Sequence, residues 1–238
     1  MANQTFVFKQ FNIQQDKCAM KVGTDAVLLG AWVKTNVIKS ILDIGTGTGI
    51  IAIMLAQKSD AQIDAIDIEL SAYEQAKENA RFCKWNDRIN VYHSSLQDYA
   101  LNANHTYDLI VTNPPYFIHS SKSNEEERTH ARHNDLLPFE ELINCVVKML
   151  DKKGRFCVIL PNKEASIFRT IANTKGLHLS NLTRVHTKVN QDTEKRHLMQ
   201  FEFESSSFSE NSIVIEKDER HEYTDEYKAL TKDYYINF

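Results

Sequence analysis

Apolar and polar residues alternate in two kinds of block along residues 39–205. Short apolar runs are typical of buried strands, and longer runs with apolar residues every three to four positions are typical of helices. Strands are predicted at 39–44, 61–67, 88–93, 106–112, 154–161, 177–187 and 196–205, and helices at 49–58, 71–85, 138–150 and 163–174. This alternation implies parallel pairing through right-handed crossovers. The last two strands have no helix between them, so we expect an antiparallel hairpin at the sheet edge.

The pattern therefore predicts an α/β fold, a Rossmann-like seven-stranded sheet with helices on both faces. Ser71 and Glu74 form a predicted capping box at the start of one of these helices. Residues 117–135 are polar and aperiodic, which is typical of a mobile loop.

The two ends of the chain lie outside this pattern. Residues 5–20 predict a short hairpin, followed by a helix at 24–34. Residues 206–238 begin as a polar linker and end in a predicted helix at 224–235, and their apolar residues at helical spacing should dock on the core: Tyr227, Leu230, Tyr234 and Phe238. We expect a single domain over 1–238, with a lead-in at 1–36, the core at 37–205 and a packed tail at 206–238.

Composition narrows the class of protein. The chain has 238 residues, of which 42% are hydrophobic and 25% charged, as in a globular protein with a sizeable core. No apolar run is long enough to span a membrane, no secretory signal begins the chain, and the four cysteines are scattered, so we expect a cytoplasmic protein without disulfides or metal. The net charge of −4 does not indicate a nucleic-acid partner, so any basic surface must be local.

Glycines gather between the first core strand and its helix, in Ile44-Gly45-Thr46-Gly47-Thr48-Gly49. They permit a tight turn and a close approach of a ligand to the backbone, although a plain turn would need them too. Asp67 ends the next strand about 20 residues on, where an acid can bind ribose hydroxyls. The spacing GxGxG, with Asp43 beside it, suits a ligand that lacks phosphates and carries a positive amino group, and S-adenosylmethionine fits.

A second unusual stretch is DLIVTNPPYFI, residues 108–118, where two prolines end a strand abruptly. The Asn113 side-chain carbonyl and the Pro114 backbone carbonyl can accept hydrogen bonds from one planar amine, and Tyr116 can stack on the ring that carries it. Such an amine needs no general base before methyl transfer, so we name no catalytic histidine. The alternative is a strand cap with a buried tyrosine.

Together these motifs resemble the class I S-adenosylmethionine-dependent methyltransferases: DIGTGTG their first motif, AIDIE their second and NPPY their fourth. KVGTDAVLLGAW, residues 21–32, resembles the segment beside the methionine end of the cofactor. The whole chain, including its last 18 residues, is most similar to the bacterial tRNA1(Val) adenine-N6 methyltransferases, which modify adenosine 37. The resemblance implies a monomer that binds S-adenosylmethionine and a tRNA anticodon stem-loop.

The resemblance also implies roles for single residues. Asn113, Pro114 and Tyr116 would be catalytic, and the cofactor would be bound by Lys21, Thr24, Asp43, Gly45, Thr46, Gly47, Gly49, Asp67, Ile68, Ser95, Leu96 and Asn113. The substrate would be bound by Pro115, Tyr116, Phe117, Arg128 and Arg132. One departure concerns the adenine: the family usually has an acid where this chain has Ser95, so Ser95 could bond the adenine instead, or Asp98 could reach back.

Several alternatives stay open. The loop with Arg128 and Arg132 could be a lid that orders on RNA or a solvated loop, and Glu125-Glu126-Glu127 favours the second. A cluster in the last two strands could touch the tRNA backbone, although a solvated turn is favoured: Arg184, His186, Lys188, Lys195, Arg196 and His197. The same motifs would serve an rRNA guanine-N2, DNA adenine-N6 or release-factor glutamine-N5 methyltransferase. A non-catalytic partner subunit of the same fold is disfavoured because both motifs are intact.

Overall fold

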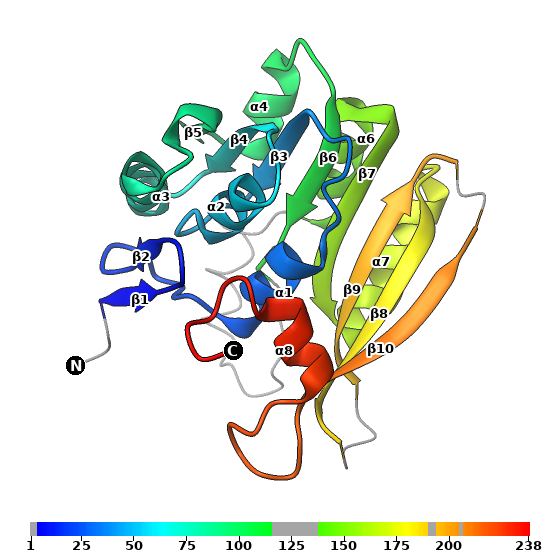
Figure 1. The fold of residues 1–238 in the computed structure, drawn as a ribbon. Helices are drawn as coiled ribbons and strands as arrows, with labels where there is room; N and C mark the ends of the chain where they lie inside the picture. Colours follow the sequence, from blue (N-terminus) through cyan, green and yellow to red (C-terminus); the bar gives the residue numbers. More distant parts are fainter. Residues whose placement is uncertain (1–3, 116–137, 190–193, 205–206) are drawn as a thin grey trace, which may run out of the picture.

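Eight strands form one mixed sheet at the centre of the molecule, and helices cover both of its faces (Figure 1). The structure is a computed structural model that describes residues 4–115, 138–189, 194–204 and 207–238. The strand order is β10-β8-β9-β7-β6-β3-β4-β5. The strands of the sheet are β3 (Ser40–Ile44), β4 (Gln62–Asp67), β5 (Ile89–His93), β6 (Tyr107–Thr112), β7 (Leu150–Pro161), β8 (His178–Lys188), β9 (Glu194–Glu202) and β10 (Ser209–Glu216).

The helices are short and mostly follow the predicted positions. They are α1 (Thr24–Trp32), α2 (Ile50–Gln57), α3 (Leu70–Phe82), α4 (Leu96–Asn102), α6 (Phe139–Met149), α7 (Asn162–Thr174) and α8 (Asp225–Thr231), with a 3-10 turn at Asn86–Arg88. A separate antiparallel hairpin, β1 (Thr5–Val7) and β2 (Asn12–Gln14), precedes α1.

Strand pairing divides the sheet into two halves. From β5 to β7 every pair is parallel, because each strand is followed by a helical crossover. β9 runs antiparallel to both β7 and β8, since only a short connection joins β8 to β9. The predicted α/β fold with helices on both faces is thereby confirmed, as is the antiparallel pairing of the last two predicted strands.

The hydrophobic core has two parts, one on each face of the sheet. On one face, buried residues of α1 and α2 pack with the β1–β2 hairpin and with the chain terminus. On the other face, α4, α6 and α7 cover the sheet with residues such as Leu142, Val146 and Phe168. Tyr227 and Tyr234 of the C-terminal segment are buried in the first of these clusters, and the Tyr234 hydroxyl donates to the Met54 carbonyl at 3.2 Å. Helix α2 is therefore enclosed on all sides, which is why its sequence is apolar throughout.

Two local predictions were wrong, and one helix was missed. The sheet has eight strands instead of seven, because residues 209–216, expected as linker, form β10 parallel to β8, and the β8–β9 hairpin is therefore not the edge. β10 escapes a pattern search because its first half is polar and exposed on both faces. Helix α4 was not predicted, since it has only two buried residues. Helix α3 begins at Leu70 without a side-chain cap, so Ser71 and Glu74 form no capping box.

Candidate active site

The carboxyl ends of β3, β4 and β6 lie side by side in the sheet. Ile44 at the end of β3 pairs with Ile66 of β4 and with Thr112 of β6. The glycine turn, Asp67 and Asn113 follow these positions directly. The fold thus brings the two motifs to one edge, where open α/β sheets bind their ligands.

The glycine turn uses its glycines in two different ways. Gly45, Gly47 and Gly49 all have positive φ values, of 67°, 58° and 81°. A Cβ atom added at Gly45 or Gly47 would meet no atom within 4 Å, whereas one at Gly49 would lie 3.3 Å from the Ala76 backbone of α3. Gly49 therefore serves helix packing, and the other two leave bare backbone beside open space, as a close-lying ligand requires.

Asp67 fastens the glycine turn to the end of β4. Its Oδ2 accepts the Gly47 N–H at 2.8 Å, and its Oδ1 accepts the Glu69 N–H at 3.0 Å. The Gly45 and Thr46 N–H groups both donate to the Ile66 carbonyl at 3.0 Å. Each carboxylate oxygen accepts one of these backbone bonds and has a further lone pair available to a ligand.

Asp43 holds the same turn from inside. It is fully buried, and its Oδ2 accepts the Thr46 hydroxyl at 2.6 Å and the Ala52 N–H of α2 at 3.2 Å. Its Oδ1 has no partner among the described residues. Burial raises the pKa of this carboxyl from 3.8 to about 7, although the two hydrogen bonds oppose the shift.

This raised pKa makes a prediction for stability. The folded protein holds the proton on Asp43 more tightly than the unfolded chain does. Protonation of Asp43 therefore adds to the free energy of unfolding. This contribution is complete below about pH 4 and is lost as pH rises through about 7. The wild-type chain should therefore lose up to about 4 kcal/mol relative to Asp43→Asn over that range. Denaturant unfolding of both proteins at several pH values measures the difference, and a constant difference would contradict the raised pKa.

Asn113 stands where β6 ends. Thr112 before it is buried and its hydroxyl donates to the Ile44 carbonyl at 2.9 Å, and Pro114 after it is buried as well. The Asn113 side chain is half-buried, and its Oδ1 has no hydrogen-bond partner among the described residues. Buried amide oxygens are nearly always paired in proteins, so an unpaired one beside a ligand-binding edge is a candidate substrate acceptor.

Asn79 of α3 was not predicted, yet it joins three segments. Its Nδ2 donates to the Thr48 carbonyl of the glycine turn and to the Gln14 carbonyl of β2, both at 2.8 Å, and its Oδ1 accepts the Gln14 N–H at 2.9 Å. The side chain is buried. Asn79 thus anchors the N-terminal hairpin to the turn, and a polar residue on the buried face of an amphipathic helix was its only signal in the sequence.

We expect Asn79→Ala to destabilise the protein by about 2–4 kcal/mol, because it leaves the buried Thr48 carbonyl and two partly buried backbone groups of Gln14 without partners. Affinity for a ligand of the glycine turn should fall at the same time, since the Thr48 carbonyl loses its anchor. Asn86→Ala is the matched control, because Asn86 is exposed and makes one weaker bond to the Arg81 carbonyl at 3.2 Å. Chemical denaturation should show a change below about 0.5 kcal/mol for the control. Equal effects of the two changes would contradict the anchoring role.

The other residues expected at the cofactor differ in exposure and in hydrogen bonding. Ile68, next to Asp67, is 62% exposed, which is unusual for isoleucine and suits an apolar platform. Ser95 caps α4: its hydroxyl accepts the Asp98 N–H and donates to Asp98 Oδ2 at 2.6 Å, so both candidates for the adenine contact are bonded to each other. Leu96, the first residue of α4, is buried.

Lys21 lies on the segment that leads into α1, Thr24 is the first residue of that helix, and both are exposed. Thr24 lines a large cavity between α1 and the C-terminal segment, which is described below. Pro115 is exposed beside Asn113. Tyr116, Phe117, Arg128 and Arg132 lie outside the described residues.

The basic residues of β8 and β9 are mostly engaged within the protein. Arg184 bonds Glu194 at 2.8 Å and Glu210 at 2.5 Å, Arg196 bonds Asp25 of α1 at 2.7 Å, and His197 is buried against Glu194. Lys195 is exposed. Most of this cluster therefore stabilises the strand ends.

In the described part of the chain, no group of three or more His, Cys, Asp and Glu side chains comes together as a metal site requires. No helix in the same ranges is long and apolar enough to cross a lipid bilayer.

Residues 18–175 match the family model of the methyltransferase small domain. The chain is 48% identical over 233 residues to a tRNA1(Val) (adenine(37)-N6)-methyltransferase of Flavobacterium psychrophilum, covering 97% of this chain and 99% of that protein. It is 45% identical over 238 residues to the protein of the same name from Phocaeicola vulgatus, covering 100% of both chains.

Solved structures support the fold. A predicted O-methyltransferase from Agrobacterium tumefaciens superimposes with a TM-score of 0.67 at 15% identity, over 88% of this chain and 96% of that one. A ribosomal protein L11 methylase from Lactobacillus delbrueckii subsp. bulgaricus superimposes with a TM-score of 0.56 at 16% identity, over 79% and 82% of the two chains. At these identities the likeness shows a shared methyltransferase fold.

Proposed function

The chain belongs to the family of tRNA1(Val) (adenine(37)-N6)-methyltransferases, and we propose that it transfers the methyl group of S-adenosylmethionine to N6 of adenosine 37 in the anticodon loop of tRNA1(Val). The observation that carries this proposal is the full-length match to relatives of that name at 45–48% identity. The glycine turn, Asp67 and Asn113 support it because they meet at one sheet edge.

The residues at this edge suit S-adenosylmethionine. Gly45 and Gly47 offer bare backbone for its amino acid part, Asp67 has oxygen lone pairs for ribose hydroxyls, and exposed Ile68 offers an apolar surface for adenine. Asp43 is closed off from the surface, and in its ionised form, which prevails above about pH 7, its field favours a positive charge nearby. Thr46, Gly49 and Leu96 shape the site, and Lys21, Thr24 and Ser95 complete the set that we propose for the cofactor.

When bound, the cofactor supplies a methyl group on a positive sulfur. The chain's own task is then to place a weak, planar amine in line with that methyl group. Asn113 Oδ1 and the Pro114 carbonyl accept its two N–H bonds, which orients the nitrogen and stabilises the positive charge that develops on it. The unpaired Asn113 Oδ1 is available for this bond.

We assign the target base to Tyr116, which would stack on it, with Pro115 and Phe117 beside it. Base stacking on an aromatic side chain contributes about 1–3 kcal/mol. Arg128 and Arg132 would contact phosphates of the anticodon loop. A loop base is suited to this reaction because it leaves its stack at lower cost than a paired base.

The proposal also covers the oligomeric state, the location, the domain organisation and the use of metals. The protein acts as a monomer in the cytoplasm, where its tRNA substrate is found. It forms a single domain in which residues 206–238 belong to the fold, as the burial of Tyr227 and Tyr234 supports. It uses no metal.

The proposal is tested by incubating the purified protein with S-adenosylmethionine and unmodified total tRNA. Nucleoside mass spectrometry should then detect N6-methyladenosine. N5-methylglutamine on a release factor, with tRNA left unmethylated, would overturn the substrate. Absence of cofactor binding by calorimetry would overturn the enzyme class.

A further inference from the structure

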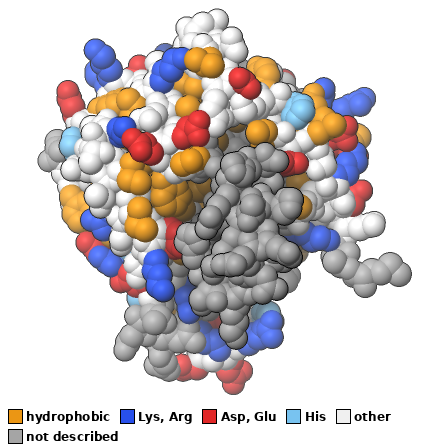
Figure 2. Space-filling view, turned by 180° about the vertical axis from the view of Figure 1, so that it is seen from behind, with side chains coloured by type: hydrophobic (Ala, Val, Ile, Leu, Met, Phe, Trp, Pro, Cys, Tyr) orange, Lys and Arg blue, Asp and Glu red, His pale blue; other side chains and the backbone are white. Residues whose placement is uncertain are grey.

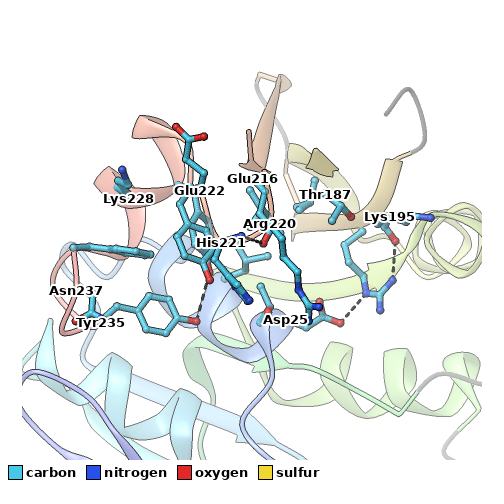
Figure 3. Close-up of a pocket in the computed structure, with 18 of the residues that line it drawn as sticks. Asp25, Thr187, Lys195, Glu216, Arg220, His221, Glu222, Lys228, Tyr235 and Asn237 are labelled. Atoms are coloured by element: carbon cyan, nitrogen blue, oxygen red, sulfur yellow. Dashed lines mark hydrogen bonds and ion pairs between the residues drawn. The ribbon is translucent and has the colours of Figure 1, made fainter. Parts of the chain in front are cut away.

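A cavity of about 1150 Å³ lies between the β8–β10 end of the sheet and the C-terminal segment, which also bonds to β10 through Thr224 (Figure 3). Its walls come from the start of α1, from the ends of β8, β9 and β10, and from α8 with the last residues of the chain. None of the glycine turn, Asp67 or Asn113 lines it. Of the residues proposed for the cofactor, Thr24 alone lines the cavity, and no group assigned to the transfer of the methyl group does.

The cavity opens at the carboxyl ends of the parallel strands, as the candidate active site does. Pro161 at the carboxyl end of β7 pairs with Arg196, and Lys188 at the end of β8 pairs with Glu216 of β10. Strands in a sheet lie about 4.8 Å apart, so β9 and β10 lie roughly 10 and 20 Å from the Asn113 strand. An RNA stem-loop with one base at Asn113 can therefore reach the cavity.

The net unpaired charge in the cavity is positive. Lys195, Arg220 and Lys228 form no ion pair or side-chain hydrogen bond with any described residue. Two acids of the lining form ion pairs: Asp25 with Arg196, and Glu222 with Lys217 at 3.1 Å. The third acid, Glu216, accepts only the His221 backbone N–H, at 3.0 Å, and keeps its negative charge. Three cations therefore face one acid that has no ionic partner among the described residues, and the excess charge is positive.

The loop that carries Arg220 is held in shape. His221 has a φ of 68°, which is uncommon for a residue other than glycine. The bond from its N–H to Glu216, the bridge between Glu216 and Tyr223, and the Lys217 N–H to the Glu222 carbonyl at 2.7 Å close the loop. Figure 3 shows Arg220 extending from this loop into the cavity, with Lys195 and Lys228 on opposite sides. A fixed loop presents its cation with little ordering cost on binding.

The distribution of charge elsewhere is different. Figure 2 shows the face of the molecule opposite to that of Figure 1, where the acidic and basic side chains of the described residues are intermingled. The whole chain carries a net charge of −4. Lys195, Arg220 and Lys228, which have no partners among the described residues, instead line one hollow. RNA backbone is the polyanion that this protein must hold if the proposed function is right, and phosphate contacts fix position instead of sequence.

We propose that this cavity, which we call the tail cavity, binds the sugar–phosphate backbone of the RNA substrate, with Lys195, Arg220 and Lys228 on its phosphates. The inference rests on the proposed function and adds a second anchoring site to it. The tail cavity holds the stem while the target base enters the site at Asn113. The C-terminal segment is then part of the RNA-binding surface.

The test uses the full chain with three substitutions, Lys195→Gln, Arg220→Gln and Lys228→Gln. The control carries Lys39→Gln, Lys152→Gln and Lys153→Gln. These three exposed lysines have no side-chain partner among the described residues and lie at the opposite end of the strands of the same sheet. Binding of an unmodified tRNA1(Val) transcript is measured between about 50 and 200 mM salt, together with the affinity for S-adenosylmethionine.

The tail-cavity variant should bind the transcript about 10–100-fold more weakly than the control at low salt. The slope of log affinity against log salt should fall in magnitude by about 2, close to 0.7 for each lost phosphate contact. Cofactor affinity should match the wild type, which shows that the variant is folded. If the wild type is active and the tail-cavity variant keeps the tRNA affinity and the salt slope of the control, the role of the tail cavity is overturned and the proposed function stands. Failure of the wild type to bind or methylate the transcript would overturn the proposed function as well.

Discussion

Replacement of Asn113 by alanine is expected to lower kcat for methyl transfer by about 10²–10³-fold, while S-adenosylmethionine still binds within a few-fold of the wild-type affinity. The side-chain oxygen that stabilises the developing charge on nitrogen would be lost. In the structure this oxygen serves no described partner, so its removal costs the fold little. Single-turnover rates with a tRNA1(Val) transcript and calorimetry with the cofactor measure the two quantities.

Asn113→Asp is the matched variant, because it keeps an acceptor oxygen at the same place. It should retain more activity than the alanine variant. Loss of cofactor binding together with turnover in Asn113→Ala would mean that Asn113 is mainly structural, and its assigned role would then fall.

Asp67→Ala should lower the affinity for S-adenosylmethionine by about 10²–10⁴-fold. Two hydrogen bonds from ribose hydroxyls to a carboxylate contribute about 1.5–3 kcal/mol each. The same substitution also releases the Gly47 N–H at 2.8 Å and the Glu69 N–H at 3.0 Å, so the glycine turn loses its tie to β4.

The effect of Asp67→Ala is measured by calorimetric titration with the cofactor. Asp87→Ala is the control, since Asp87 is exposed on the 3-10 turn that follows α3. It should bind the cofactor as the wild type does. A wild-type affinity in Asp67→Ala would exclude Asp67 from the cofactor site.

The parts of the fold that bury apolar residues at a regular spacing could be predicted from the sequence. β3, β4 and β6 were found within one or two residues, because their runs are continuous and their ends are marked by glycine, acid or proline. β10 was missed because an edge strand buries little and can therefore be polar. Its presence creates one wall of the tail cavity, so the cavity could not be foreseen either.

Within the site, positions that require an unusual backbone conformation were easier to predict than the hydrogen-bond partners of side chains. The three glycines were identified because only glycine adopts their positive φ values readily. The burial of Asp43 under the turn and the triple role of Asn79 depend on long-range packing, and no spacing in the sequence encodes such contacts. The cap that Ser95 forms with Asp98 is local, three residues apart, and was missed because helix α4 itself was not predicted. A polar residue on an otherwise apolar helix face, such as Asn79, is a pattern in the sequence that indicates a buried hydrogen-bonding role.

The central claim is that this chain methylates adenosine 37 of tRNA1(Val). The most direct measurement compares methyl incorporation from S-adenosylmethionine into two transcripts of this tRNA, one unchanged and one with guanosine in place of adenosine 37. The account predicts about one methyl group per unchanged transcript, located at position 37 by mass spectrometry of nuclease fragments, and none in the other. Equal methylation of both transcripts, or of neither, would contradict it.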